Sequence, residues 1–313
     1  MSRIHEALKK AELERASRPR APMDLKTAAD SEISPPPAEA TSGAVELGLP
    51  MTGMGLDEGS DQLTLENIQT QVKRLKWHPD LKTMLFFGQE AYAFGTEEFR
   101  TLRSHLYGFR DLEPLRTILI TSAAPGEGKS FIAANLAQIL VQQPGQRVLL
   151  IDGDLRWSRL HLVLGTPASP GLTEYLGGEV NELSVIQRGP LDNLFFIPGG
   201  RHAPNPAEII ANGRLKELLH RLSPLFDWVI VDSPPAMAVS DPLVMAEACD
   251  SVLLVVGAGM QPFEALQKTR QQFSGKRLLG VVLNRAEHRA SYSYKYYEYY
   301  GGAEKGRDAK SKG

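Results

Sequence analysis

The sequence predicts an α/β fold in which a mostly parallel β-sheet carries helices on both faces. From residue 117 onward, short apolar runs typical of buried strands alternate with stretches whose apolar residues recur at helical spacing. A glycine-rich turn joins the first such run to the first such helix, and two later runs each end in an aspartate. Alternation of this kind is typical of parallel sheets covered by helices on both sides.

Six strands and four helices are expected in this region. The strands are expected at Thr117–Thr121, Val148–Asp152, Leu194–Pro198, Trp228–Asp232, Val252–Val256 and Leu279–Asn284. The helices are expected near Ser130–Gln142, Ala207–Leu222, Asp241–Ala248 and Phe263–Phe273. In such a sheet, the loops beyond the carboxyl ends of the strands build the functional site.

The glycine-rich turn has the layout of a phosphate-binding loop, and the fold is therefore expected to be P-loop NTPase-like. Gly126 and Gly128 lack a Cβ, so the backbone there can turn its N–H groups toward phosphate oxygens. Pro125 and Glu127 complete the turn, and the helix that follows adds partial positive charge at its N-terminus.

Lys129 and Ser130 supply the side chains that such a loop needs. Lys129 can reach the outer phosphates of a nucleotide, and the Ser130 hydroxyl can bind Mg²⁺. The first glycine of the usual pattern is Ala123 here, which removes conformational freedom but no ligand.

Two predicted strands end in an acidic residue, Asp152 and Asp232. A carboxylate at the tip of a buried strand beside a phosphate loop is placed to hold Mg²⁺ directly or through water. The alternative is an aspartate that only caps a turn. Asp154 is expected to assist the metal or accept a proton, and Arg156 to meet phosphate or a subunit. Asn284, after the last strand, lies where a nucleotide base could rest, although a cap or turn role would also explain it.

Four segments are expected along the chain. Residues 1–18 predict a short amphipathic helix, either frayed or docking a partner. Residues 19–84 are rich in Pro, Ala, Gly and Ser and predict a mostly disordered linker with a short helix near Leu63–Trp77. The folded domain is expected over residues 85–288, and a tyrosine-rich tail over residues 289–313.

A further helix is expected at Gly95–Tyr107, with three charged residues spaced three apart. Glu97, Arg100 and Arg103 can project together from such a helix. They form either a solvated charged face or a subunit contact, for which the guanidinium forks are suited.

The tail concentrates six of the nine tyrosines of the chain. They are Tyr292, Tyr294, Tyr296, Tyr297, Tyr299 and Tyr300. The run lies past the last core strand and is interrupted by Ser, Lys and Glu, which favours an accessible tail whose phenols are substrates. The alternative is that these tyrosines pack back on the domain.

The overall charge, the cysteine count and the absence of long apolar runs limit the classes of function that the chain can have. The net charge of −2 gives no electrostatic argument for nucleic acid. Cys249 is the single cysteine, so no internal disulfide is possible and a reducing cytoplasm is expected. No apolar run approaches the ~18–20 residues of a membrane span, and the first residues lack the core of a secretion signal. If the protein works at a membrane, something else must hold it there.

From about Glu97 to Gly301, the chain resembles the bacterial tyrosine kinase family of polysaccharide synthesis. The phosphate loop S-A-A-P-G-E-G-K-S matches its Walker A form, while I-D-G-D-L-R and V-I-V-D-S-P-P resemble its Walker A′ and Walker B motifs. Glu97-x-x-Arg100-x-x-Arg103 resembles its oligomerisation motif, and the tyrosine cluster also matches. The first twelve residues resemble the subgroup of exosortase-type exopolysaccharide loci. Trp157-Ser158 departs from the basic residue and proline usual there, and the fused transmembrane half of some members is absent.

The resemblance implies ATP- and Mg²⁺-dependent autophosphorylation of the tail tyrosines, in trans, within a ring that is commonly an octamer. It implies a split, cytoplasmic type held at the inner membrane by a separate transmembrane activator, with a protein-tyrosine phosphatase reversing the reaction. The cycle is expected to control synthesis or export of an exopolysaccharide.

Two other functions remain open from the residues alone. One is a partitioning or division-site ATPase of the same class, without kinase activity. Such proteins carry a lysine early in the loop, at the position of Ala124 here. The other is a scaffold that binds ATP only to hold an assembly together.

Overall fold

The structure, a computed structural model, describes residues 63–72, 74–87 and 95–286. The helix predicted at residues 1–18, the linker up to residue 62 and the tail predicted at residues 289–313 lie outside these ranges. Within them, no helix combines the length and apolar character needed to cross a membrane.

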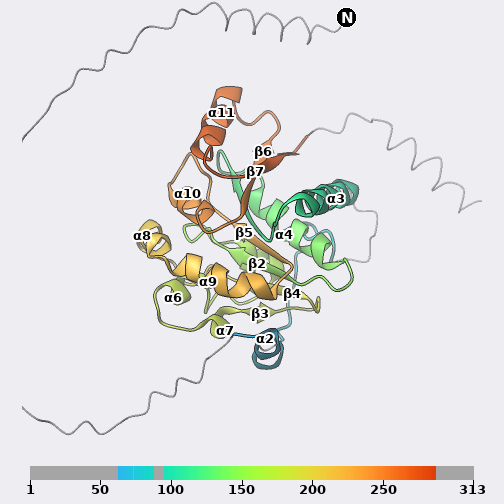
Figure 1. Cartoon of the computed structure of the whole chain (residues 1–313), viewed down its shortest axis with the longest axis vertical. Helices are drawn as coiled ribbons and strands as arrows, with labels where there is room; N and C mark the ends of the chain where they lie inside the picture. Colours follow the sequence, from blue (N-terminus) through green and yellow to red (C-terminus); the bar gives the residue numbers. More distant parts are fainter. Residues whose placement is uncertain (1–62, 73, 88–94, 287–313) are drawn as a thin grey trace, which may run out of the picture. The chain divides into compact units, whose positions relative to one another are not determined.

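Seven strands in the described ranges form one sheet, which confirms the predicted mostly parallel architecture (Figure 1). In spatial order they are β3 (Gln187–Arg188), β4 (Leu194–Ile197), β2 (Val148–Asp152), β5 (Trp228–Asp232), β1 (Thr117–Ser122), β6 (Ser251–Gly257) and β7 (Leu278–Asn284). Neighbouring strands pair in parallel, except that β3 runs antiparallel to β4. All six predicted strands are present, whereas β3 has too few residues to show a periodic pattern.

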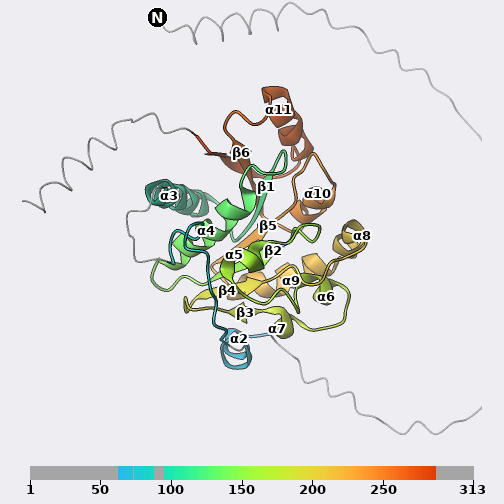
Figure 2. The ribbon, with the colours of Figure 1, turned by 180° about the vertical axis from the view of Figure 1, so that it is seen from behind.

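Helices cover both faces of the sheet, as Figures 1 and 2 show from opposite sides. On one face lie α3 (Thr96–Leu112), α4 (Lys129–Val141) and α5 (Leu160–Leu164). On the other lie α2 (Leu65–Gln71), α6 (Leu172–Leu176), α7 (Glu182–Val185), α8 (Pro206–Ala211), α9 (Arg214–Leu222) and α10 (Asp241–Ala246). Strand β1 serves both cores, because Ile118 and Ile120 face α4 while Leu119 faces the other layer.

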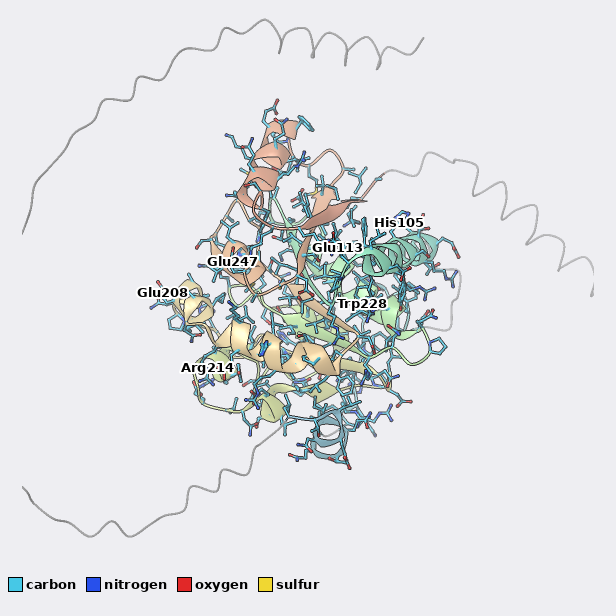
Figure 3. All side chains as sticks on the ribbon, in the orientation of Figure 1. His105, Glu113, Glu208, Arg214, Trp228 and Glu247 are labelled. Carbon is cyan, nitrogen blue, oxygen red and sulfur yellow. The ribbon has the colours of Figure 1, made fainter. Side chains whose placement is uncertain are left out.

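Buried aromatic rings anchor α3 to the sheet. Trp228, at the start of β5, is fully buried and meets the Tyr107 ring edge-on at a centroid distance of 5.5 Å (Figure 3). The Arg110 guanidinium lies 4.9 Å from the centre of the same indole. The helix predicted at Gly95–Tyr107 therefore exists, and it extends to Leu112.

The segment predicted as one helix at Ala207–Leu222 is two helices, α8 and α9. Gly213 has a φ of +87°, a left-handed conformation that interrupts helical geometry. A short 3₁₀ turn, Ser223–Leu225, follows α9, and α11 (Phe263–Gln272) precedes β7.

Packed structure begins earlier than the expected domain start at residue 85. Ile68 of α2 is fully buried in one core, and Trp77 and Met84 are buried in the other. The Leu75 N–H also donates to the Arg188 carbonyl at 2.8 Å, beside the sheet edge. Helix α2 is shorter than the predicted Leu63–Trp77, because Val72 already has extended backbone angles. These apolar residues are too sparse in the sequence to reveal their packing.

Candidate nucleotide site

The carboxyl ends of the central parallel strands meet at one edge of the sheet, and the predicted site residues gather there. Strand β1 leads into the loop at residues 123–128, and α4 begins directly after it. Asp152 ends β2 and Asp232 ends β5, and the two are register partners on adjacent strands. The topology therefore brings the phosphate loop and both strand-end carboxylates together, as the sequence predicts.

The two glycines of the loop adopt backbone angles that other residues rarely take. Gly126 has a φ of +83° and Gly128 a φ of +96°. A Cβ on Gly128 would lie 2.0 Å from the Asn284 amide nitrogen, so a side chain does not fit there. The loop thus has the curled strand–loop–helix geometry in which backbone N–H groups and a helix N-terminus can face phosphate.

The Glu127 side chain points into the protein. It is fully buried, and its carboxylate accepts hydrogen bonds from the Ala124 N–H at 2.7 Å and the Gly257 N–H at 3.1 Å. At this position only the backbone of Glu127, and not its side chain, is available to contact a nucleotide. Proximity in sequence predicts Glu127 as a cofactor-binding residue, but it does not reveal this inward orientation.

Lys129 lies among the site carboxylates. Its Nζ is 2.9 Å from Asp154 Oδ2 and 3.4 Å from Ser130 Oγ. Burial lowers the pKa of Lys129, but Asp232 and Asp154 outweigh it, so the net shift of that pKa is upward. The lysine is therefore a fixed positive charge at the start of α4, where phosphate oxygens would need one.

Asp152 and Asp232 are both buried, and each has one carboxylate oxygen, Oδ1, with no hydrogen-bond partner among the described residues. Burial and then the charge of Asp232 raise the pKa of Asp152 to about 7. Burial raises the pKa of Asp232 to about 6, although Lys129 and Ser130 oppose that rise. Buried carboxylate oxygens without a partner are costly unless a cation balances them.

These two oxygens fit the predicted divalent cation. Hard cations such as Mg²⁺ prefer oxygen ligands and are usually held by one or two carboxylates together with substrate phosphates. The described residues contain no group of three or more His, Cys, Asp or Glu side chains able to hold a metal by themselves. Ser130, Asp152 and Asp232 thus suit a cation that arrives with a nucleotide.

Ser158 is a site residue that the sequence reasoning missed. Its Oγ donates to Asp152 Oδ2 at 2.8 Å, and the Leu160 N–H donates to the same oxygen at 3.1 Å. These bonds orient Asp152 so that Oδ1 remains free. The Trp157-Ser158 departure from the family pattern was the available signal.

Arg156 has a partner within its own chain, and its predicted contact with phosphate or a subunit remains a prediction. Its guanidinium makes a two-pronged ion pair with Asp241 at the start of α10, at 2.7 and 3.0 Å. The Asp241 side chain has no exposed surface, so the pair fixes the loop after β2 against the opposite helical layer. Asp241 could not be predicted as the partner of Arg156 because the two residues are 85 positions apart in the sequence.

Asn284 lies at the end of β7, against the phosphate loop. Its Nδ2 donates to the Glu127 carbonyl at 2.8 Å, which gives it a contact in the loop whatever it does toward a nucleotide base. The predicted contact with the base remains a prediction.

The predicted oligomer motif lies on α3. Arg100 pairs with Glu97 one turn earlier on the same helix. Arg103 instead donates to the Ile139 carbonyl of α4 at 3.1 Å. Glu97 and Arg100 remain at the surface, and their role between subunits stays a prediction.

Comparison with known proteins places this site in a defined group. The CobQ/CobB/MinD/ParA nucleotide binding domain family matches residues 118–300. The tyrosine-protein kinase YwqD of Bacillus subtilis is 33% identical over 210 residues, which cover 66% of this chain and 88% of YwqD. The tyrosine-protein kinase Etk of Escherichia coli is 37% identical over 203 residues, which cover 64% of this chain and 28% of Etk.

Solved structures agree with these similarities. The kinase domain of Escherichia coli Etk superposes with a TM-score of 0.57 at 34% identity, over 62% of this chain and 77% of that domain. The chimeric protein CapA2B2 superposes with a TM-score of 0.61 at 30% identity, over 71% of this chain and 99% of the chimera. The chain thus spans most of YwqD but less than a third of Etk.

Proposed function

Because the chain belongs to the bacterial tyrosine-protein kinases within the CobQ/CobB/MinD/ParA nucleotide-binding family, we propose that it phosphorylates its own tail tyrosines with ATP, between neighbouring protomers. One observation carries this proposal. Lys129 at the phosphate loop is surrounded by three buried aspartates, two of which hold an unpartnered oxygen. Phosphoryl transfer needs a positive charge beside the phosphates. It also needs carboxylates that bind a metal ion and accept a proton.

The residues of the chain divide the work of binding. Backbone N–H groups of Gly126, Glu127 and Gly128 and the Lys129 ammonium would hold the phosphates of ATP, and Ser130, Asp152 and Asp232 would hold Mg²⁺. Bound Mg²⁺ supplies neutralising charge on the phosphate oxygens. Lys129 exchanges its bond with Asp154 for a bond with phosphate, which frees a carboxylate oxygen beside the reacting group.

The transfer step needs a proton acceptor. The phenolic oxygen of a tail tyrosine attacks the γ-phosphorus, the bond from that phosphorus to the bridging oxygen breaks, and ADP leaves. Since a phenol has a pKa of about 10, its proton must pass to a base during the step. We assign this role to Asp152 or Asp154, whose carboxylates both lie near Lys129.

We place this reaction in exopolysaccharide synthesis or export. The chain works in the cytoplasm as a ring, held at the inner membrane by a separate transmembrane activator, and a protein-tyrosine phosphatase resets it. The partitioning-ATPase alternative is not favoured, because the relatives described above are tyrosine-protein kinases and the early loop lysine is replaced by Ala124.

Changing the six tail tyrosines to phenylalanine should abolish phosphotyrosine while leaving nucleotide binding intact. The measurement is intact-protein mass and phosphotyrosine blotting after incubation with Mg²⁺-ATP. Tyr107→Phe is the matched control, because the buried Tyr107 hydroxyl has no hydrogen-bond partner in the described structure and its loss should change nothing. Undiminished phosphorylation of the six-fold variant would show that the acceptors lie elsewhere.

Replacing Arg100 and Arg103 with alanine should dissociate the proposed ring into smaller species. Light scattering measures the mass, and thermal unfolding is followed in parallel because Arg103 also contacts Ile139 within the chain. His105→Ala, an exposed change on the same helix (Figure 3), should leave the mass unaltered. An unchanged mass for a folded double variant would remove α3 from the subunit contact.

A further inference from the structure

We propose that Glu127 is a positioning residue that sets the shape of the phosphate loop by tying it to the end of β6. The proposal deepens the nucleotide-dependent function proposed above, on which it rests. The Glu127 carboxylate is fully buried between two backbone donors, one inside the loop and one on the sheet.

The two carboxylate oxygens act in different directions. Oε2 accepts from Ala124 N at 2.7 Å, which closes the loop across Pro125 and Gly126. Oε1 accepts from Gly257 N at 3.1 Å, which fastens the closed loop to the last residue of β6. Both are charge-assisted hydrogen bonds, which are stronger than bonds between neutral groups. Glutamine would present an amide N–H₂ to one of the two N–H donors, so it can satisfy only one of them.

The backbone of the same residue is held from a second strand. The Glu127 carbonyl accepts from Asn284 Nδ2 at 2.8 Å, and Asn284 ends β7. The start of the loop is held by a third connection, because the Ala236 N–H donates to the Ser122 carbonyl at 2.8 Å. A loop held at each end before nucleotide arrives avoids much of the ordering cost of binding.

Glu127 is not expected to touch the nucleotide through its side chain. Both carboxylate oxygens are engaged, and none of its surface is exposed. A carboxylate turned toward phosphate would also repel it. Its contribution to binding is therefore exerted through the geometry of the neighbouring backbone N–H groups.

The chain contains a comparison site at the opposite end of the same strands, where the exposed Asp250 carboxylate also joins two strands. Asp250, directly before β6, accepts through Oδ2 from the N–H groups of Arg116 and Thr117, both at 2.8 Å, where β1 begins. Asp250 thus connects the starts of β1 and β6. Glu127 connects the loop that follows β1 to the end of β6. Both Glu127→Gln and Asp250→Asn remove a carboxylate charge that accepts from two backbone N–H groups, in the first case in the phosphate loop and in the second away from it. The Asp250→Asn amide oxygen can still accept from both donors, whereas Glu127→Gln also loses one acceptor.

The experiment measures Mg²⁺-dependent binding of a fluorescent methylanthraniloyl ADP to the full chain, together with thermal unfolding. Both variants should unfold at lower temperature than the parent. Glu127→Gln should raise the dissociation constant by about ten-fold or more, the effect of losing charged hydrogen bonds, whereas Asp250→Asn should stay within about two-fold. In the kinase assay, Glu127→Gln should raise KM for ATP more than it lowers kcat, whereas partial unfolding would lower kcat alone.

Equal nucleotide affinity in the two variants would overturn the proposal. If Glu127→Gln does not fold, Glu127→Asp replaces it, since the shorter carboxylate cannot span both donors, and the same comparison decides. A parent chain that binds the fluorescent ADP but phosphorylates no tyrosine would remove the kinase proposal and leave this one standing.

Discussion

Replacing Lys129 with methionine should lower tail phosphorylation by about a thousand-fold or more, the range seen when a main electrostatic contributor to phosphoryl transfer is lost. Methionine keeps much of the length and apolar stem of lysine but removes the charge that the three site aspartates surround. Incorporation of γ-labelled phosphate into the purified full chain measures the effect.

The variant should remain folded, because Asp232, whose pKa burial already raises to about 6, can take up a proton when the ammonium is gone. Lys276→Met is the control, since Lys276 pairs with Glu247 at the surface and lies outside the site. Mixing the Lys129→Met chain with the chain that lacks the six tail tyrosines tests transfer between protomers. Phosphate should then appear on the Lys129→Met chain, and normal labelling of that chain by itself would refute the assigned role of the lysine.

Replacing Asp152 with asparagine should have two opposite effects, on activity and on stability. Phosphorylation should fall by about a hundred-fold or more, because a proposed metal ligand and candidate base is lost. In metal-free buffer above pH 7, however, the variant should be more stable than the parent. Asparagine relieves a buried negative charge next to Asp232 and can still accept a hydrogen bond from Ser158.

The direction of the pH dependence follows from the raised pKa of Asp152. Burial and Asp232 move that pKa from 3.8 to about 7, so the folded chain binds more protons than the unfolded chain between these values. The contribution of this group to stability therefore declines as pH rises through that window. Thermal unfolding of the parent at pH 5 and pH 8 should show the decline, and the Asp152→Asn chain should show less of it.

Asp227→Asn provides a control in which the change in stability at neutral pH is expected to have the opposite sign. Burial would raise the pKa of Asp227, but hydrogen bonds from Arg147 outweigh it and lower that pKa. Removing this carboxylate should therefore destabilise the chain at neutral pH. The raised pKa of Asp152 would be contradicted if stability rose steadily from pH 5 to pH 8 and rose by the same amount in the parent and in the Asp152→Asn chain.

The sheet could be predicted from the sequence because local patterns specify it. Strands β2, β4, β5 and β6 each contain an apolar run of four or more residues. The glycines, Lys129 and Ser130 occur together in one short stretch. Asp152 and Asp232 could be placed because parallel strands bring their carboxyl ends to one edge. Gly213 shows the limit of such patterns, since an apolar face continues through it although the helix does not.

The missed features depend on contacts between residues far apart in the chain. Glu127 reaches Gly257, Arg156 reaches Asp241, and Trp77 packs against Phe196 at a ring distance of 6.1 Å. None of these partners is marked by spacing or composition. Such contacts are determined by how loops and connecting segments pack once the sheet has formed, which a single sequence does not encode locally.

The bond between Asn284 and the phosphate loop also sets the origin of a tether. Tyr292 lies eight residues beyond Asn284, a fully extended length of at most about 29 Å, and Tyr300 lies sixteen residues beyond it, at most about 58 Å. The proposed acceptor phenols therefore follow the phosphate-loop contact of their own protomer within these contour lengths. Because the proposed transfer runs between protomers, it needs an assembly that brings these tethers to a neighbouring site, so the initial rate per chain should fall when dilution separates the protomers.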